Sequence, residues 1–183
     1  MNEKITLRAI EPEDVDFMFE CEYDDSAWKW SDYTAPFSRQ QLLEYALNYD
    51  ANPFASRQLR LIAQTQSGMR IGIVDLFDIS ARDRKAYAGL TIFPDFRGNG
   101  YGKGALETLK KIAFHRLGLR KLVAVTATTN IPALKLFKKG GFEEITVLPA
   151  WHTIDGEDLD FSLLVCTGNG CECECKESCQ SES

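Results

Sequence analysis

The 183-residue sequence lacks any long hydrophobic run. No stretch approaches the ~20 consecutive apolar residues that a membrane-spanning helix needs. The opening segment, MNEKITLRAIEPED, also lacks the apolar core of a secretory signal. We therefore expect a cytoplasmic protein with no membrane partner.

An excess of basic residues is also missing. The chain has 21 Lys and Arg against 27 Asp and Glu, which gives a formal net charge of −6. This balance argues against broad binding to nucleic acids or anionic membranes, because both need positive charge on the protein. It mildly favours a cationic small molecule as partner.

Cysteine is almost absent before position 166. Of the six cysteines, Cys21 lies in the body of the chain and the other five lie in the final segment, CTGNGCECECKESCQSES. Without a secretory signal these thiols should stay reduced, and their spacing lacks the paired C-x-x-C of a structural zinc site. We expect neither a disulfide framework nor a required metal. Adventitious or regulated binding of a soft metal by the tail is the alternative.

The composition divides the chain into a folded part and a tail. Overall, 44% of residues are apolar and 26% are charged, as is usual for one globular domain of this length. From 167 onward, cysteine is the only hydrophobic residue type, so this segment cannot bury enough apolar area to fold. We predict a domain over residues 1–166 and a disordered Cys/Glu-rich tail over 167–183.

The hydrophobic periodicity switches repeatedly between that of strands and that of helices. Turn and capping residues divide the segments, among them Ser38 and Asn130 as helix N-caps and Gly118 as a helix end. The predicted order is β-α-α-β-β-β-α-β-α-β-β. It implies an α+β fold with a mixed, mostly antiparallel sheet covered by helices. The segments, in order, are 4–10, 12–23, 38–50, 57–66, 69–80, 86–93, 100–117, 121–128, 131–139, 142–153 and 157–165.

A glycine-rich loop, DFRGNGYGKG (95–104), separates a predicted strand from a predicted helix. It does not fit a Walker A loop, because Arg97 stands where the first glycine is needed and Gly104 follows Lys103. The segment GYGKGA does fit the dinucleotide pattern G-x-G-x-x-[GA]. However, the acidic residue expected ~20 positions later is missing, and the preceding strands form an antiparallel meander.

A third pattern fits this loop. RGNGYG resembles the R/Q-x-x-G-x-G/A loop of the GNAT superfamily of N-acetyltransferases. The longer segment GIVDLFDISARDRKAYAGLTIFPDFRGNGYG is similar to the central block of its spermidine/spermine and ribosomal-protein branches. TTNIPALKLFKKGGFEE resembles the next family block, N-x-x-A-x-x-x-Y-x-K-x-G-F. These similarities cover roughly residues 70–145, and the predicted element order matches the GNAT fold.

The resemblance implies acetyl-CoA as cosubstrate. Backbone amides at a helix N-terminus can hold a pyrophosphate, and glycine lets the backbone approach it. A tight turn with no ligand is the structural alternative for the glycines, and a plain helix N-cap is the alternative for Asn130. The residues expected to bind acetyl-CoA are Leu90, Thr91, Ile92, Phe93, Arg97, Gly98, Asn99, Gly100, Tyr101, Gly102, Lys103 and Asn130.

The resemblance also implies direct attack of an amine on the thioester while both substrates are bound. The tyrosine that usually protonates the departing thiolate is replaced by Phe137, so a water or another hydroxyl such as Tyr101 must serve. Tyr87 stands where related enzymes often carry Glu. Asp75 aligns with an acidic residue of the polyamine branch and is the candidate base. Its alternative is a polar residue on a solvated strand face.

Substrate choice in this fold depends largely on the segment between the first two helices. Here Asp24, Asp25 and Asp32 stand among Trp28, Trp30 and Tyr33, a combination that suits a cation, although the polyamine branch has a denser glutamate cluster.

Two functions are compatible with these motifs. The first is an N-acetyltransferase that acts on a primary amine, either a small amine such as a polyamine or a protein amino group. The alternative is an acyl-CoA-binding GNAT-fold module with little transfer activity, which the phenylalanine at position 137 motivates. The sequence leaves open whether the chain forms a homodimer.

Overall fold

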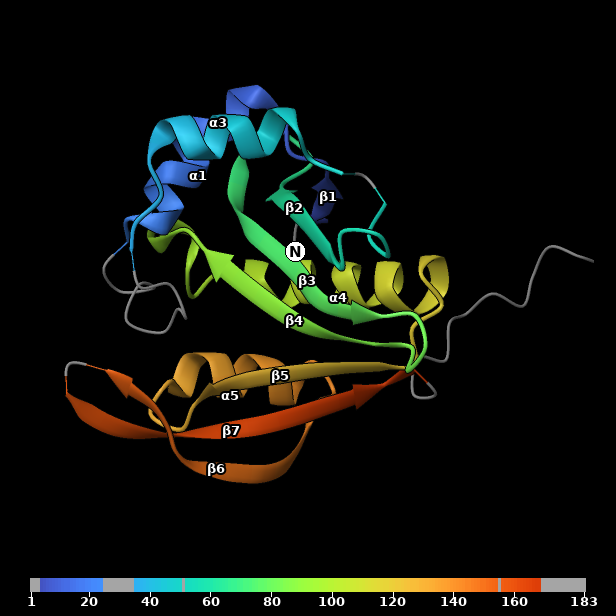
Figure 1. Cartoon of the computed structure of the whole chain (residues 1–183), viewed down its shortest axis with the longest axis vertical. Coiled ribbons are helices and arrows are strands. Elements are labelled where there is room, and N and C mark those ends of the chain that lie inside the picture. The colour runs from blue at the N-terminus through green and yellow to red at the C-terminus, as the bar shows by residue number, and fades with distance from the viewer. Residues whose placement is uncertain (1–3, 25–34, 51, 155, 169–183) are drawn as a thin grey trace, which may run out of the picture.

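A computed structural model describes residues 4–24, 35–50, 52–154 and 156–168 (Figure 1). The chain forms one seven-stranded sheet with the strand order β1-β2-β3-β4-β5-β7-β6. Strands β4 and β5 run parallel, and every other neighbouring pair is antiparallel. This arrangement confirms the expected α+β fold with a mixed, mostly antiparallel sheet.

The strands are β1 (Thr6–Arg8), β2 (Gln58–Gln64), β3 (Arg70–Ser80), β4 (Lys85–Ile92), β5 (Lys121–Ala127), β6 (Glu143–Ile154) and β7 (Glu157–Thr167). The α-helices of the described ranges are α1 (Val15–Glu22), α3 (Arg39–Leu47), α4 (Tyr101–Lys111) and α5 (Ile131–Lys139). Two 3₁₀ turns, Pro12–Asp14 and Pro94–Phe96, and one π turn, Ile112–Arg116, complete the order.

The long helix expected over 100–117 is in fact two pieces. Its α-helical part ends at Lys111, and the chain continues as a π turn in which the Leu117 N–H donates to the Ile112 carbonyl. Gly118 follows with a φ of 63°, a conformation that costs glycine little. The wider turn brings the chain round into β5, which explains why helical periodicity alone overestimated the α-helix.

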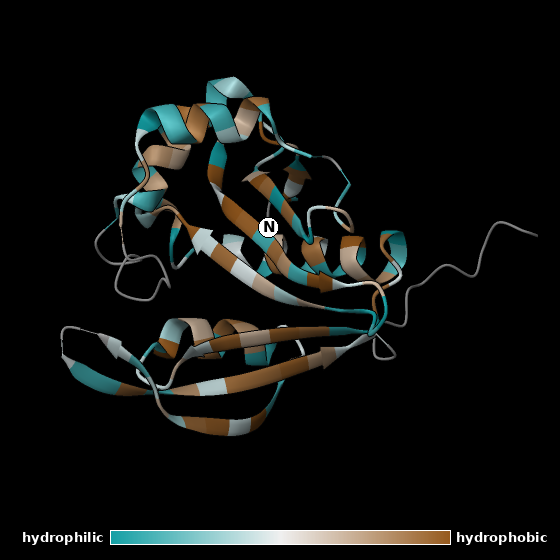
Figure 2. Ribbon diagram, in the orientation of Figure 1, coloured by the Kyte–Doolittle hydropathy of each residue, from teal (hydrophilic) through white to brown (hydrophobic). Residues whose placement is uncertain are grey.

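Helices cover both faces of the sheet. Ile62 of β2 and Ile73 of β3 lie in a hydrophobic cluster with residues of α1 and α3. Val74 and Leu76 of β3 point to the opposite face, into a larger cluster that includes Leu106 of α4. Figure 2 shows hydrophobic residues along β3, β5 and β7, in the middle of the sheet. Among the helices described, none combines the length and apolarity required to cross a bilayer.

The C-terminal end of the domain extends slightly beyond the predicted boundary. Strand β7 continues to Thr167, and the Gly168 N–H donates to the Arg120 carbonyl at 2.9 Å. Most of the predicted tail, from 169 onward, lies outside the described residues. The division into a domain and a disordered tail therefore stays a prediction.

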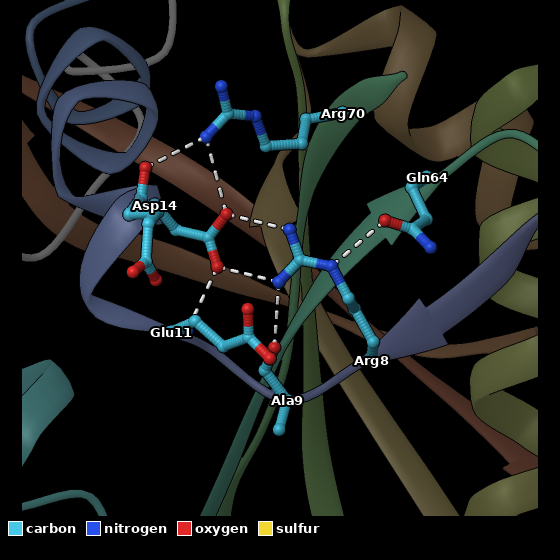
Figure 3. Close-up of polar contacts among 7 residues, drawn as sticks. Arg8, Ala9, Glu11, Asp14, Gln64 and Arg70 are labelled. Atoms are coloured by element: carbon cyan, nitrogen blue, oxygen red, sulfur yellow. Dashed lines mark hydrogen bonds and ion pairs between the residues drawn. The ribbon is translucent and has the colours of Figure 1, made fainter. Parts of the chain in front are cut away.

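A buried carboxylate fixes the start of α1 to the sheet (Figure 3). Asp14 accepts two hydrogen bonds from Arg8, at 2.6 and 2.7 Å, one from the Glu11 N–H at 2.9 Å and one from Arg70 at 3.3 Å. Its side chain is 1% exposed. Burial raises the pKa of the Asp14 carboxyl, but the hydrogen bonds from Arg8 and the Glu11 amide outweigh it, and the pKa lies below its usual value.

Replacing Asp14 with Asn should destabilise the protein by about 2 kcal/mol, because the substitution removes the charge of a buried carboxylate that accepts hydrogen bonds from the half-buried Arg8. Urea unfolding at pH 7 measures the difference. Because the folded pKa is lowered, the stabilisation is complete above the ordinary Asp pKa of about 3.9 and is lost as the pH falls through the folded pKa.

Asp16 provides the matched control. Asp16, on α1, forms an ion pair with Arg39 of α3, but both side chains are exposed. Asp16→Asn should therefore cost less than about 1 kcal/mol. Equal losses for the two variants would show that burial of Asp14 does not decide the effect.

Candidate functional site

Strands β4 and β5 pair over three residues and then separate. The paired residues are 85–87 of β4 and 121–123 of β5. Beyond them β4 stays paired to β3 as far as Ile92, while β5 stays paired to β7 as far as Ala127 (Figure 1). The edge of β4 that faces β5 therefore has no strand partner over its last five residues, 88–92.

The alternation of backbone groups shows which residues face this open edge. The Phe93 N–H donates to the Ile71 carbonyl, so Phe93 and Thr91 direct their backbone groups toward β3. Leu90 and Ile92 must then direct theirs toward β5. Within the predicted segment 90–93, Leu90 and Ile92 thus direct their peptide groups into the gap between β4 and β5. The other two residues direct theirs toward β3.

The glycine loop connects this edge to α4. Gly98 and Gly100 have φ values of 79° and 82°, a region that other residues enter only with strain. The Arg97 N–H donates to the Pro94 carbonyl, and the Lys103 N–H donates to the Gly100 carbonyl. Between them lie five consecutive N–H groups for which no acceptor is found within the described ranges: those of Gly98, Asn99, Gly100, Tyr101 and Gly102.

These five amides form an anion site by their chemistry. They stand at the N-terminus of an α-helix of 11 residues, where the helix dipole adds partial positive charge. A Cβ at Gly98 would meet no atom within 4 Å, so the approach to the loop is open on that side. The loop therefore fits a pyrophosphate group, with 98–102 as donors rather than the full predicted range of 97–103.

The Arg97 side chain lies between the loop and two other elements. Its Nε donates to the Ile92 carbonyl at 2.7 Å, and its guanidinium forms an ion pair with Asp24, which follows α1. Arg97 thus holds the loop against the end of β4 and against the segment after α1.

Tyr101 and Lys103 direct their side chains elsewhere. The Tyr101 ring packs edge-on against Phe96, with centroids 6.0 Å apart, and Lys103 lies 3.7 Å from Glu107 on the surface of α4. Both residues line a cavity of about 700 Å³ between α4 and β1. Neither the segment 90–93 nor Asn130 lines it. Asn99 and Gly100 of the loop line it as well, so four predicted site residues border a cavity on the β1 side of α4.

Asn130 caps α5 at the end of the gap where β5 finishes. Its side-chain oxygen accepts a hydrogen bond from the Ala133 N–H at 3.3 Å. The helix-cap alternative is therefore realised, and the side-chain NH₂ group can still donate to a ligand.

Phe137 lies further along α5 and is 6% exposed. Its ring packs edge-on against Phe142 with centroids 5.1 Å apart, so it belongs to the main core.

Asp75 lies on β3, on the face covered by α1, and its neighbours across the sheet are Arg60 and Gly89. Both of its carboxylate oxygens accept hydrogen bonds from Arg60, at 2.7 and 3.3 Å. The same guanidinium donates to Glu22, at the end of α1, at 3.1 Å. Sequence reasoning missed Glu22 and Arg60, since no spacing links residues 38 positions apart.

The remaining predicted substrate residues, Asp25, Trp28, Trp30, Asp32 and Tyr33, lie outside the described residues. Within the ranges that the structure describes, no three His, Cys, Asp or Glu side chains gather in a way that could hold a metal ion.

Comparisons with known proteins agree with this geometry. A family model described as an acetyltransferase (GNAT) domain matches residues 4–143. A spermidine N(1)-acetyltransferase from Vibrio cholerae is 26% identical over 160 residues, which cover 87% of this chain and 91% of the relative. A putative [ribosomal protein bS18]-alanine N-acetyltransferase from Bacillus subtilis is 25% identical, with coverages of 86% and 93%.

A solved structure gives the same result for the fold. The spermidine N-acetyltransferase from Vibrio cholerae, in complex with CoA and spermine, superposes with a TM-score of 0.81 at 24% identity. The match covers 91% of this chain and 96% of that one.

The open edge of β4, the amide loop and the family match together define a class of enzyme. The chain belongs to the GNAT acetyltransferase family. Its class of activity is that of an N-acetyltransferase with acetyl-CoA as cosubstrate.

Replacing Gly98 with Ala should weaken CoA binding at least about tenfold. The side chain would strain a φ of 79° and turn the loop amides away from their present directions. Isothermal titration calorimetry with CoA measures the change. Gly68→Ala is the control, because Gly68 has a φ of 85° and equal open space in the β2–β3 turn. Equal CoA affinities for both variants would contradict the loop assignment.

Proposed function

We propose that the protein transfers the acetyl group of acetyl-CoA directly to a primary amine, most suitably a cationic one. The observation that carries this proposal is the meeting of two features at one end of the sheet. The five loop amides can hold an anion, and the open edge of β4 beside them can pair with an extended ligand.

Each part of the site has a separate task in this proposal. The amides of 98–102 bind the pyrophosphate, while the backbone groups of Leu90 and the N–H of Ile92 pair with the pantetheine arm and orient the acetyl carbonyl. The side-chain NH₂ group of Asn130 donates to the same arm from the opposite side of the gap. Acetyl-CoA supplies an activated thioester, so the protein mainly positions it and excludes water.

The acceptor class rests on charge and on the relatives. Relatives that match most of this chain are named as acting on spermidine or on an alanine of a ribosomal protein. On the α1 side of the sheet, Glu22 and Asp75 share a single arginine, so this part of the face carries excess negative charge. A polyamine fits this charge better than a neutral amine does, and a protein amino group is the second acceptor class.

A binding module with little transfer activity is the competing function. The observation that favours it is Phe137, whose buried ring offers no proton to a departing thiolate. Loss of a positioned acid typically costs ~10²- to 10⁴-fold in rate, which slows a reaction without preventing it. The enzyme is therefore the better-supported proposal.

Mass spectrometry with acetyl-CoA and a panel of polyamines, amino acids, aminoglycosides and peptide N-termini tests the proposal. We expect a singly acetylated product from at least one cationic amine. Thermal stabilisation by CoA without any product would favour the binding module. Absence of both would overturn the two functions together.

Replacing Phe137 with Tyr should raise the turnover of a chemistry-limited reaction by at least about tenfold, because the hydroxyl restores an acid near the sulfur. Single-turnover kinetics with the best amine measures the rate. An unchanged rate would count against a missing acid as the limiting defect.

Phe142→Tyr is the matched control for a hydroxyl in the same aromatic pair. Phe142 is 3% exposed and contacts Phe137 edge-on. A hydroxyl buried there without a partner should cost about 1–3 kcal/mol of stability and bring no gain in rate. A comparable gain in both variants would point to loosened packing instead.

The cytoplasmic location stays a prediction, and the sequence left the oligomeric state open. Support for self-association comes from the edge strand β6, where Ile145, Val147 and Trp151 are exposed apolar residues. Sedimentation velocity on the full chain gives the mass directly.

A further inference from the structure

A buried group of three charged side chains lies beneath the C-terminal end of α1. Arg60 of β2 stands between Glu22 of α1 and Asp75 of β3. The side chains of Arg60, Glu22 and Asp75 are 9%, 11% and 18% exposed. Two carboxylates thus share one guanidinium, and the group carries one more negative charge than positive charge. No structural need for this excess is evident, because one carboxylate already pairs with the arginine.

The two carboxylates are held differently. Asp75 uses both oxygens, each of which accepts a hydrogen bond from Arg60. Glu22 accepts through Oε1 at 3.1 Å, and no donor to Oε2 is found among the residues that the structure describes. A proton therefore has a place to bind on Glu22 without breaking a hydrogen bond, whereas on Asp75 it would displace an arginine N–H.

The face of the sheet beside these groups is partly open. Gly89 of β4 is the neighbour of Asp75, and a Cβ placed on it would approach Asp75 Cβ and Phe77 Cε1 to 3.5 Å. Two residues further along β3, Phe77 stacks on Tyr87 of β4, with ring centroids 5.5 Å apart. Phe77 is 39% exposed. Gly89 places no side chain over this part of β4, one residue before Leu90 of the open edge.

The surroundings of Glu22 suit a group that exchanges protons. Burial raises the pKa of the Glu22 carboxyl, the Arg60 guanidinium lowers it and the Asp75 carboxylate raises it, with a net rise above the ordinary value. Tyr49, which follows α3, accepts a hydrogen bond from the Arg60 N–H, and its own pKa is raised by burial, so it stays neutral here. A base works best when its pKa lies near the working pH.

We propose that Glu22 accepts the proton of the incoming ammonium, directly or through one water, and that Arg60 and Asp75 are positioning residues that hold its carboxylate beside the open edge of β4. This inference rests on the proposed acetyl transfer and replaces Asp75 by Glu22 as the base. The geometry points to Glu22 because it combines an available oxygen and burial with a place beside Asp75, whose neighbour Gly89 comes one residue before Leu90 of the open edge.

The proton balance of the step is simple. An N–H bond of the ammonium breaks, its electron pair stays on nitrogen, and the proton moves to Glu22 Oε2. The nitrogen lone pair then forms the bond to the acetyl carbon as the carbon–sulfur bond breaks. A second N–H bond of that nitrogen breaks and gives its proton to water, and the thiolate takes up a proton from water. Ammonium and thioester together give an amide, a thiol and one proton, which Glu22 releases to solvent.

The pH profile of kcat for Glu22→Gln, measured on the full chain with the best amine, tests this role. We expect kcat near pH 7 to fall ~10²- to 10⁴-fold and to recover only as the pH approaches the pKa of the amine itself. Glu22→Asp should restore part of the rate. The control is Glu20→Gln, because Glu20 is exposed on the same helix and should leave the profile unchanged. Unchanged CoA affinity in each variant confirms folding.

Asp75→Asn separates the two carboxylates. Because Asp75 raises the pKa of Glu22, its removal should move the acid limb of kcat to lower pH while the limb persists. Loss of the limb in Asp75→Asn but not in Glu22→Gln would make Asp75 the base and overturn the proposal. A Glu22→Gln variant with raised KM and normal kcat would also overturn it, since Glu22 would then only bind the cation. Absence of product from the wild type with every amine would overturn both proposals.

Discussion

The separation of β4 from β5 is the constraint on which the site depends. A sheet that stayed paired across these strands would bury every peptide group of β4 in hydrogen bonds with its neighbours. Here the last five residues of β4 keep β3 on one side and lack a strand on the other. Because α4 begins at the end of the same strand, its free amides and the open edge of β4 face the same region. One irregularity in the sheet thus places two kinds of hydrogen-bonding group within reach of one extended ligand.

Charged contacts at both ends of α1 hold this helix against the sheet. Asp14 binds Arg8 and Arg70 before the helix begins, and Glu22 binds Arg60 where it ends. Just after the helix, Asp24 is attached to the glycine loop through its ion pair with Arg97. A buried ion pair stabilises little compared with apolar packing of the same size, but it tolerates few alternative geometries. These contacts therefore fix where α1 lies over the sheet.

Much of this arrangement could be predicted from the sequence, and the missing part has a common cause. The alternating strands, the glycine loop and the Asn130 cap are local patterns, and the structure contains each of them. The shared arginine is not local, because it depends on the register that places Arg60 opposite Asp75 and on the position of α1 above them. The directions of the Tyr101 and Lys103 side chains depend likewise on their contacts with Phe96 and Glu107. Sequence motifs thus predicted the loop, whereas the buried charged group around Arg60 follows only from the three-dimensional arrangement.

Two departures from the family pattern have a connected physical explanation. Tyr87 stands where related enzymes often carry an acid, and its ring stacks on Phe77. An acid at this position would stand on an aromatic surface, where a charge is poorly solvated. An acid supplied from α1 avoids that cost, because Glu22 lies next to an arginine that stabilises its charged form. Phe137 differs in that nothing among its described neighbours replaces the missing hydroxyl. In the proposed mechanism the ammonium proton thus passes to Glu22 within the fold, whereas no described side chain beside Phe137 supplies a proton to the departing sulfur.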